Sequence, residues 1–380
     1  MLLLDNKVNK KKVLHIITGL GDGGAEGVLY RLCKNSKNFK HEVISLTGNG
    51  KYTSMLEEVG VVVYPFYFSS VFSFFKLIFL IKTINPELVQ TWMYHSDLIG
   101  GGAAKIAGIK KIFWGVRHSN LEKGKVKNST IYIARLSALF SKFIPTKIIC
   151  CANKAKEVHL NIGYCKEKLL VIQNGYDFSK FYPSNEYRQK IRQEWKLDNS
   201  TFVIGNVARY DPFKDHENLL RALCKLKLSA VPFRCFLIGN NITDQNVELK
   251  NKVIELDLSS NVILIGPRRD IPAVMNALDL HVLSSSSEGF PNVVAESMAC
   301  GAFNVSTQVG DISEIIPNPR LICPTKNSDA LFDVIKLAYD MWAKYPEDFL
   351  MQKKQNERVI KEKFSINTMV SAFENCWKQL

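Results

Sequence analysis

The sequence predicts an α/β protein with two Rossmann-like domains, and three observations support this prediction. Short β-rich runs alternate with turns that contain Gly or Ser and with helical stretches along the chain. A polar stretch around residues 174–185 interrupts this alternation, which then starts again. The 380 residues also suffice for two domains of ordinary size. Strands that alternate with helices are typical of parallel, doubly wound sheets. We therefore expect one domain at residues 1–180 and another at residues 181–363.

The strands of both domains are expected where β-branched and other apolar residues form short runs between turn residues. In the first domain these runs cover residues 13–17, 41–47, 61–64, 88–91, 111–116, 147–151 and 171–172. In the second they cover residues 202–205, 233–238, 262–264, 281–283 and 304–306. Helical stretches between the runs include residues 26–33, 217–226 and 271–277. Ligands of such sheets bind at the carboxyl ends of the strands, so we expect a ligand in a cleft between two facing domains.

The composition excludes several classes of protein. Hydrophobic residues make up 46% of the chain and charged residues 23%, which is ordinary for a globular protein and excludes a disordered or collagen-like chain. No apolar run reaches the roughly 18 residues that span a bilayer, and we expect no signal peptide. The nine cysteines form no C-x-x-C pair and are expected to be free thiols in a reducing compartment. We therefore expect a cytoplasmic protein without a metal site.

The positive charge is concentrated in the first half of the chain. Up to Pro183 there are 26 Lys and Arg against 12 Asp and Glu, and the remainder has 24 of each, so the first half carries the whole net charge of +14. Such asymmetry suits nucleic acid, an anionic membrane or a phosphorylated substrate, although a solvated basic surface is the simpler alternative. No motif of a nucleic-acid-binding module is present. Residues 71–82 are expected to form a mostly apolar helix, either buried against the sheet or lying in a membrane interface.

A glycine-rich loop joins the first expected strand to the first helix. Residues 19–24 fit the pattern G-x-G-x-x-G, in which glycines let the backbone approach a phosphate and a helix N-terminus supplies N–H donors. A nicotinamide-dependent enzyme would also need a carboxylate about 20 residues later, at the end of the second strand. Residues 45–48 there contain none. The loop therefore faces a phosphate or is simply a tight turn, and a dehydrogenase is disfavoured.

A second pattern lies after the expected strand 281–283. Pro291 suits the first turn of a helix, Glu288 lies in the loop before it, and Glu296 lies inside it eight residues later. The free N–H groups of that helix N-terminus favour an anion such as a diphosphate. Carboxylates accept hydrogen bonds from hydroxyls, so a sugar and a ribose would satisfy the two glutamates on either side of the diphosphate. The alternative is an unrelated pair, one acid in a surface loop and one on a helix.

Residues 288–296 resemble the E-x7-E element of retaining, nucleotide-sugar-dependent glycosyltransferases of family 4, which have the GT-B fold of two facing Rossmann-like domains. The resemblance covers almost the whole chain. It includes the Gly-Gly-Ala-Glu loop at residues 23–26, the Asn-Gly-x-Asp element at 174–177, the basic segment at 207–215, and Gly310 with Glu314. Residues 91–97 and 114–119 resemble the branch that builds bacterial surface polysaccharides. The sequence departs from the family pattern at Gly27, at residues 239–241 and at residues 301–303.

The resemblance implies roles for four catalytic residues. Arg209 and Lys214 would stabilise the charge that grows on the leaving diphosphate, in place of a divalent metal. Glu288 would bind hydroxyls of the donor sugar, and His118 would lie beside the transferred sugar. No metal and no cofactor is expected.

The same resemblance implies two binding sites and a docked C-terminal helix. The implied donor-binding residues are Gly23, Gly24, Asn174, Gly289, Phe290, Pro291, Asn292, Val293 and Glu296. The implied acceptor-binding residues are Tyr94, His95, Arg117 and Lys123. As in the family, residues 364–380 would pack back on the first domain.

The function implied is transfer of a sugar, with retention, from a nucleotide sugar, which we expect to be a UDP-sugar. The acceptor would be a glycan or a polyprenyl-diphosphate-linked lipid in the biosynthesis of O-antigen or capsule-type polysaccharide, including lipopolysaccharide. The protein would then be peripheral at the anionic inner face of the cytoplasmic membrane. The alternatives are an epimerase or another sugar-nucleotide enzyme of the same fold, and a basic membrane- or nucleic-acid-binding protein without catalysis.

Overall fold

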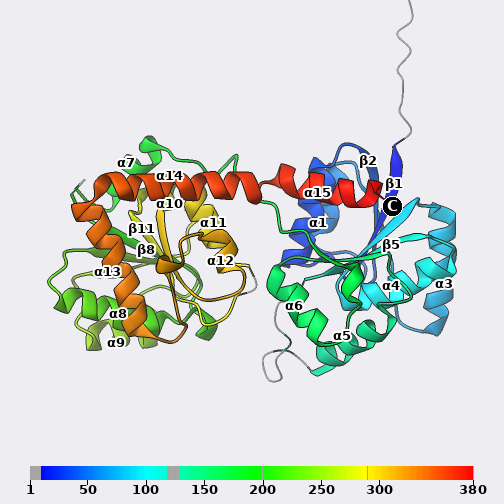
Figure 1. Cartoon of the computed structure of the whole chain (residues 1–380), viewed down its shortest axis with the longest axis horizontal. Coiled ribbons are helices and arrows are strands. Elements are labelled where there is room, and N and C mark those ends of the chain that lie inside the picture. The colour runs from blue at the N-terminus through cyan, green and yellow to red at the C-terminus, as the bar shows by residue number, and fades with distance from the viewer. Residues whose placement is uncertain are drawn as a thin grey trace, which may run out of the picture. The chain divides into compact units, whose positions relative to one another are not determined.

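The computed structural model describes residues 10–117, 121, 126, 128–198, 200–288 and 290–379. Contacts divide the chain into unit 1, Met1–Tyr176 with Ile366–Leu380, and unit 2, Asp177–Ser365 (Figure 1). The divisions fall four and two residues from the boundaries expected at 180 and 363. Each unit is built on a parallel sheet with helices on its faces, so the predicted α/β class is confirmed.

The described part of unit 1 contains a parallel sheet with the order β3-β2-β1-β4-β5-β6-β7. Its strands are β1 (Lys11–Ile17), β2 (Phe39–Ser45), β3 (Val62–Pro65), β4 (Leu88–Trp92), β5 (Lys111–Val116), β6 (Lys147–Cys150) and β7 (Leu169–Val171). The chain turns from β1 to β2 on one side, and β4 lies on the other side of β1. Such a switch point opens a crevice at the carboxyl ends of the strands, and ligands bind there in open α/β sheets.

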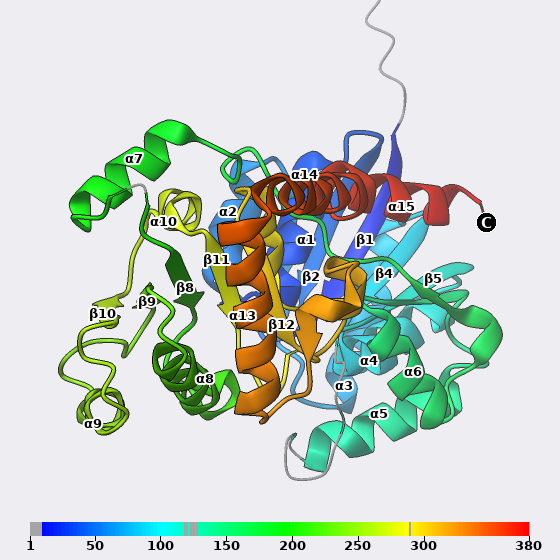
Figure 2. The same ribbon diagram turned by 60° about the vertical axis from the view of Figure 1, so that its left-hand side comes forward.

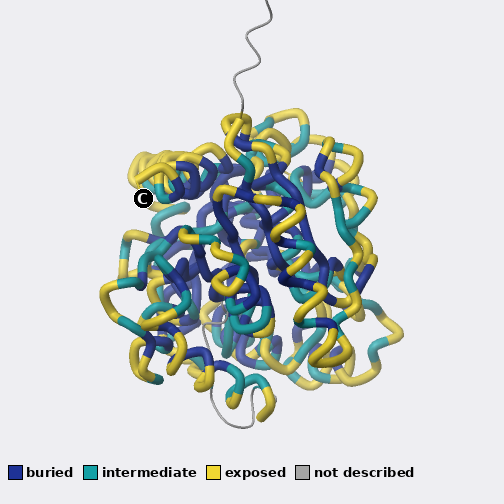
Figure 3. The backbone as a smooth tube through the Cα atoms, turned by 90° about the vertical axis from the view of Figure 1, so that its right-hand side faces the viewer, coloured by how far each residue is buried: buried dark blue, intermediate teal, exposed yellow. Residues whose placement is uncertain are grey.

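Helices cover both faces of this sheet. One face packs against α1 (Gly24–Asn35), α2 (Lys51–Glu58) and α15 (Ile366–Lys378). The other packs against α3 (Val71–Ile84), α4 (Tyr94–Ile106), α5 (Asn128–Phe140) and α6 (Asn153–Asn161). Figure 2 shows α15 beside β1 and the helices α3, α4 and α5 on the other side of the sheet. The central strands are buried between these layers, whereas the edge strand β3 and the outer sides of the helices are exposed (Figure 3).

Helix α3 is buried on one side, as the first alternative for residues 71–82 expects, and is exposed on the other; a membrane contact of this helix stays a prediction. Ser70 caps its N-terminus by accepting a hydrogen bond from the Ser73 backbone N–H, and Asn85 ends it with φ of 48°. The side chains of Leu77 and Ile81 are buried against the sheet, together with those of Ile78 and Ile84. The opposite side exposes large apolar residues: Val71, Phe72, Phe75 and Phe79.

The described part of unit 2 contains a parallel sheet with the order β10-β9-β8-β11-β12-β13. Its strands are β8 (Val203–Val207), β9 (Arg234–Ile238), β10 (Val262–Gly266), β11 (Leu280–Leu283), β12 (Phe303–Thr307) and β13 (Ile322–Cys323). Its helices are α7 (Asn185–Glu194), α8 (His216–Leu228), α9 (Val247–Glu255), α10 (Ile271–Ala277), α11 (Asn292–Ala299), α12 (Ile312–Ile315), α13 (Ser328–Lys344) and α14 (Pro346–Lys363). The strand order reverses between β8 and β11, which places a second ligand crevice beside the loops that follow these strands.

Among the described residues, no helix has the length and apolar character needed to cross a bilayer.

Candidate active site

The two loops at the switch point of unit 2 are tied to each other by hydrogen bonds. The Ser284 hydroxyl donates to the backbone carbonyl of Lys214 at 2.8 Å, and the Ser286 backbone N–H donates to the carbonyl of Phe213 at 2.8 Å. From β12, the Thr307 hydroxyl donates to the Ser285 carbonyl at 2.6 Å. These bonds fix the loop after β8 relative to the loop after β11, so the side chains that they carry are held in place without a ligand.

Lys214 and Glu288, two of the predicted catalytic residues, form an ion pair in this crevice. The distance from Lys214 Nζ to Glu288 Oε1 is 2.5 Å, and the Ser285 hydroxyl donates to the same oxygen at 2.7 Å. Both side chains are largely shielded from solvent, with exposed fractions of 21% and 15%. An ammonium group has three N–H donors, so Lys214 can bind an anion while it stays paired with Glu288.

Arg209 lies at the start of the same loop and is more exposed. Its guanidinium pairs with Asp211 at 3.1 Å. The other oxygen of Asp211 accepts the Phe213 backbone N–H at 2.9 Å, and this hydrogen bond together with Arg209 holds the pKa of Asp211 below its usual value. Asp211 therefore orients both the turn at Pro212–Lys214 and the arginine. The sequence analysis did not select it, although an Asp directly before Pro at such a turn is a recognisable cap.

The predicted donor-binding segment surrounds the N-terminus of α11. Pro291 is the N-cap of this helix, one position before the first turn in which it was expected. Asn292 is exposed and Glu296 is half-buried on the following turn. Phe290 contacts the ring of Phe364 at a centroid distance of 5.3 Å.

Val293 and Gly289 are the remaining members of that segment. Val293 packs against the hydrophobic core of unit 2, so its side chain has a structural role. Gly289 lies outside the described residues. The donor-binding role of the segment stays a prediction.

The glycine loop of unit 1 follows β1 at the switch point of that sheet. A Cβ atom at Gly19 would lie 2.6 Å from the Thr47 hydroxyl, and one at Gly23 would collide with the carboxylate of Glu26. At Gly21 and Gly24 a Cβ atom would meet nothing within 4 Å. Side chains at Gly19 and Gly23 would displace the Thr47 hydroxyl and the Glu26 carboxylate, whereas Gly21 and Gly24 leave open space beside the N-terminus of α1.

Arg117 and Asn174 are brought together at the carboxyl edge of the same sheet. Arg117 donates from Nη1 to Asn174 Oδ1 at 2.9 Å, and its guanidinium lies 4.5 Å from the centroid of the Trp92 ring. Its Nε and Nη2 are buried and have no hydrogen-bond partner among the described residues. Burial also lowers the pKa of Arg117. A buried guanidinium with unpaired N–H groups is costly unless an anion binds it, so this position suits a phosphate.

The other predicted acceptor residues have different surroundings. Tyr94 lies in the core of unit 1, and its hydroxyl is bonded to His159 Nε2 at 2.6 Å. The expectation that Tyr94 contacts an acceptor is therefore corrected: the ring and hydroxyl are both used in packing. His95, the next residue of α4, is exposed. The predicted residues His118 and Lys123 lie outside the described residues.

Asp97 is a buried acid close to this edge that the sequence analysis did not assign. Its Oδ1 accepts the Thr91 hydroxyl at 2.5 Å and the Gly115 backbone N–H at 3.3 Å. Burial raises the pKa of Asp97 to about 8 against the opposing effect of these hydrogen bonds and of Arg117. The sequence offered one indication of a specific role for Asp97. It lies in the first turn of α4, where a negative charge stabilises the N-terminus of a helix.

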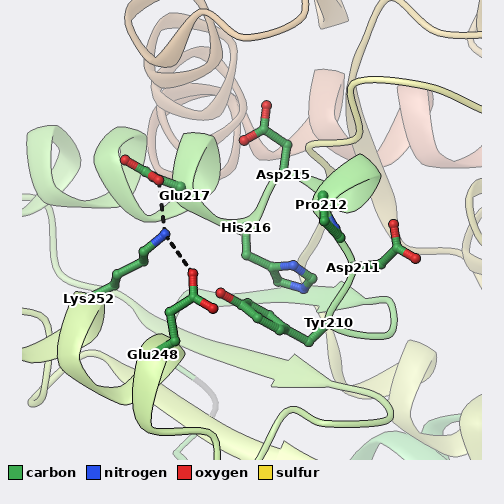
Figure 4. Close-up of a pocket in the computed structure, with 8 residues that line it drawn as sticks. All are labelled: Tyr210, Asp211, Pro212, Asp215, His216, Glu217, Glu248 and Lys252. Carbon is green, nitrogen blue, oxygen red and sulfur yellow. Dashed lines mark hydrogen bonds and ion pairs between the residues drawn. The ribbon is translucent and has the colours of Figure 1, made fainter. Parts of the chain in front are cut away.

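A separate pocket of about 270 Å³ lies behind the loop that carries Arg209 and Lys214 (Figure 4). Its wall is rich in acids, but Lys252 crosses it and pairs with Glu217 at 3.0 Å and with Glu248 at 3.3 Å. His216 is buried in the wall, and burial lowers its pKa to about 4. The Lys252–Glu217 pair connects α8 to α9, and the Lys252–Glu248 pair lies within α9, so these charges are used in structural pairs behind the loop.

A buried cluster in unit 1 has residue types that bind metals. Ligand atoms of His15, Cys33 and His41 lie within 4.8 Å of one another. The indole N–H of Trp92 donates to His15 Nδ1 at 3.2 Å, and His15 Nε2 lies 2.9 Å from His41 Nδ1. Because an indole can only donate, Nδ1 of His15 is the acceptor and Nε2 carries the proton. A metal at Nε2 would require the opposite tautomer, so these residues do not fit a metal site.

Comparisons with known proteins agree with this architecture. The family model "Glycosyltransferase Family 4" matches residues 22–180, and "Glycosyl transferases group 1" matches residues 187–356. The structure of HepE from Anabaena in complex with UDP superposes with a TM-score of 0.83 at 21% identity, over 97% of this chain and all of that one. A glycosyltransferase from Rickettsia africae superposes with a TM-score of 0.80 at 20% identity, over 98% of both chains.

Curated relatives give the same family. The chain is 29% identical over 338 residues to the N,N'-diacetylbacillosaminyl-diphospho-undecaprenol alpha-1,3-N-acetylgalactosaminyltransferase of Campylobacter jejuni. This match covers 84% of the present chain and 88% of the relative. It is 28% identical over 234 residues to the UDP-Gal:alpha-D-GlcNAc-diphosphoundecaprenol alpha-1,3-galactosyltransferase of Escherichia coli, a match that covers 60% of this chain and 59% of the relative. The two family matches, one for each unit, confirm the resemblance, and the chain belongs to the GT-B-fold glycosyltransferases of family 4, group 1.

Proposed function

We propose that this glycosyltransferase moves a sugar, with retention, from a UDP-sugar to an acceptor carried on a polyprenyl diphosphate during assembly of a bacterial surface polysaccharide. The Lys214–Glu288 pair at the switch point of unit 2 is the observation that carries the proposal. The relatives from C. jejuni and E. coli support the acceptor class, because the names of both include a diphospho-undecaprenol-linked sugar. The name of the E. coli relative also includes UDP-Gal.

The donor would bind with its diphosphate between the loop after β8 and the N-terminus of α11. Lys214 and Arg209 would bind phosphate oxygens and stabilise the charge that develops as the sugar–phosphate bond breaks. Two preorganised cations and the N–H groups of α11 can supply the charge stabilisation that a divalent metal gives elsewhere, so we propose that transfer needs no metal. Glu288 would accept a hydrogen bond from a sugar hydroxyl, and Glu296 would bind the ribose.

Retention follows if the acceptor hydroxyl attacks the anomeric carbon from the face that the diphosphate leaves. The bond between the anomeric carbon and the phosphate oxygen breaks, a bond to the acceptor oxygen forms, and the hydroxyl proton passes to the departing phosphate oxygen. The products are UDP and the elongated acceptor, so atoms and charge balance without a protein nucleophile. Glu288 is then a binding group and does not form a covalent intermediate.

The acceptor diphosphate would bind at the carboxyl edge of the sheet of unit 1. Arg117 offers two unpaired, buried N–H donors there, and Arg31 lies close enough to contribute to its electrostatic surroundings. A diphosphate would satisfy these donors and offset the cost of burying the guanidinium. His118 and Lys123 remain proposed members of this site. The enzyme would act as a peripheral protein on the cytoplasmic side of the membrane, with no role for nucleic acid.

The test is sugar transfer to a synthetic polyprenyl-diphosphate saccharide with a panel of UDP-sugars. Lys214→Ala and Glu288→Gln should each lower turnover roughly 10²–10³-fold or more, as loss of a preorganised charge does in other enzymes. Lys227→Ala is the matched control, since this lysine is also half-buried and pairs with Asp257 at 2.8 Å, but lies at the C-terminal end of α8, away from the loop. Near-normal turnover in either site variant would overturn the assignment.

Four further readouts separate the alternatives. The anomeric configuration of the product tests retention, and activity in the presence of a chelator tests metal independence. Conversion of the UDP-sugar without an acceptor would instead indicate an epimerase or another sugar-nucleotide enzyme. Salt-sensitive binding to nucleic acid without any effect of UDP-sugars would indicate a non-catalytic binding protein.

A further inference from the structure

Helices α3, α4 and α5 form one layer of unit 1, and the outer surface of this layer is unusually apolar. The three helices bury their inner sides in the same hydrophobic core, and Figures 1 and 2 show them side by side. On the outside, α3 exposes Phe72, Phe75 and Phe79 by 68%, 62% and 73%. On the other side of α4, the α5 segment exposes large side chains as well: Tyr132, Leu136, Leu139, Phe140 and Phe143. In the described part of unit 2, by comparison, Phe213 is the one strongly exposed phenylalanine.

The same layer carries positive charge that no exposed acid on these helices balances. Asp97 is the one Asp or Glu within α3, α4 and α5, all of whose residues are described, and it is completely buried. Exposed Lys and Arg are distributed over the layer and its turns: Lys76, Lys82, Lys105, Lys110, Arg135 and Lys142. The nearest exposed acid after α3, Glu87, pairs with Lys11 at 3.6 Å. The layer therefore combines aromatic side chains with net positive charge.

Local contacts show how the two kinds of side chain coexist. Lys76 Nζ lies 5.1 Å from the centroid of the Phe72 ring, so the ammonium stays next to an exposed aromatic face. On α5, Arg135 lines an open groove of about 690 Å³ together with Tyr132, Leu136 and Leu139. Apolar surface next to cations is what an anionic lipid surface requires, because acyl chains take up the apolar side chains while the cations meet headgroup phosphates.

We propose that the outer surface of α3, α4 and α5 docks unit 1 onto an anionic lipid bilayer. A second copy of the chain is the other occupant that an apolar face could have. Self-association through this face would bring the unbalanced cations of both copies together, whereas an anionic bilayer neutralises them. This surface would bring the enzyme to the lipid-linked acceptor proposed above, and in that respect the inference rests on the proposed function. Lipid binding itself can be measured without donor or acceptor.

The apolar part of the surface is tested by co-sedimentation with vesicles of phosphatidylcholine, with and without phosphatidylglycerol. The full chain should bind the anionic vesicles and bind the zwitterionic vesicles far more weakly. The triple variant Phe72→Ser, Phe75→Ser and Phe79→Ser should lose more than about tenfold of this affinity. The matched control is Leu228→Ser with Val247→Ser, which removes exposed apolar residues of unit 2 and should not change binding.

The charged part is tested separately. Lys76→Gln with Lys82→Gln should weaken binding about 30-fold at low salt, because each lysine near an anionic surface contributes on the order of a fivefold factor. The control pair Lys225→Gln with Lys250→Gln removes the same charge from unit 2 and should have little effect. Lys76, Lys82 and Lys250 are exposed and Lys225 is partly exposed, and unchanged melting temperatures would show that each variant is folded.

Two outcomes would overturn the proposal. One is vesicle binding by the triple phenylalanine variant that equals that of the unchanged protein. The other is a wild-type dimer that becomes monomeric in this variant, which would make the surface an interface between copies. Failure of the sugar-transfer assay would leave the vesicle result unaffected, so the two proposals can fail independently.

Discussion

Acid is expected to destabilise unit 1 through the buried histidine pair beneath α15. His15 on β1 and His41 on β2 stack at 5.2 Å, and the ring of Trp377 on α15 lies 5.9 Å from His15 and 6.0 Å from His41. Hydrogen bonds run from Trp92 to His15 and from His15 to His41. This direction leaves the proton of His41 on Nε2, which is buried and has no partner among the described residues. The arrangement therefore accommodates two neutral rings.

The size and sign of the effect follow from the pKa of His41. Burial lowers this pKa to about 4, with Glu374 opposing the shift and Lys10 adding to it. In the unfolded chain the value is about 6.5, so the unfolded state binds more protons between pH 6.5 and 4. The stability that the neutral ring provides is therefore complete above pH 6.5 and is lost as the pH falls through this window. At pH 5 the loss for His41 alone is about 2 kcal/mol, since one pKa unit corresponds to about 1.4 kcal/mol.

The assay is thermal unfolding of the unchanged protein and of His41→Gln between pH 7 and pH 5. Glutamine can still accept the hydrogen bond from His15 but does not titrate, so the difference between the two proteins reports His41 together with its effect on His15, whose pKa burial and His41 both lower. Other buried histidines, such as His216 and His281, remain in both proteins and cancel. The unchanged protein should lose roughly 4–8 °C more than the variant for a unit of this size.

The control and the refuting result are defined by the same curves. His95→Gln replaces an exposed histidine of unit 1 and should leave the pH dependence unchanged. Identical pH dependence of His41→Gln and the unchanged protein would show that His41 does not provide pH-dependent stability. Hydrogen exchange of α15 at pH 5 would locate the effect, because Trp377 and Glu374 hold that helix on the sheet.

Two further predictions concern unit 2. Asp279→Ala should lower the free energy of unfolding by about 3–5 kcal/mol, because it removes the carboxylate that lies 2.5 Å from the buried guanidinium of Arg192. Chemical denaturation should show a far smaller effect for Asp244→Ala, which removes an exposed carboxylate. Gly239→Ala should lower the free energy of unfolding by about 1–3 kcal/mol, because φ of Gly239 is 151° and a Cβ atom there would collide with the Ala208 carbonyl. An unchanged melting temperature of Gly239→Ala would contradict this reading of the loop.

Much of the fold could be predicted because each strand combines β-branched residues with turn residues at its ends. The expected runs overlap twelve of the strands, although the run 171–172 shares only Val171 with β7, and the expected helix at residues 271–277 has the same bounds as α10. Strand β13 was missed because two residues carry no periodicity. The orientation of α3 could not be decided, since a helix with apolar residues on nearly all sides gives no clear inner face. Packing decides it, because Leu77 and Ile81 face the sheet.

The candidate site was predictable in its residue types and not in its contacts. The family resemblance selects Lys214 and Glu288, but nothing in a separation of 74 residues shows that they pair. Tyr94 shows the opposite error: a motif placed it near an acceptor, whereas its hydroxyl bonds to His159 in the core. The buried pair of His15 and His41 had no signal at all, because neighbouring strands bring together residues that are 26 positions apart.

If the proposed function is right, the hydrogen bonds of the crevice in unit 2 would let catalytic positioning precede donor binding. The Lys214 carbonyl is held by Ser284, and its ammonium is held by Glu288, so the backbone and side chain of the lysine are fixed from the loop after β11. A cation that is already in place requires no reorganisation when charge develops on a leaving diphosphate, and this is the condition under which electrostatic stabilisation lowers a barrier. Ser285 holds Glu288 in turn. Loss of Glu288 should therefore impair Lys214 as well. The turnover of the double variant Lys214→Ala with Glu288→Gln should then be little lower than that of either single variant.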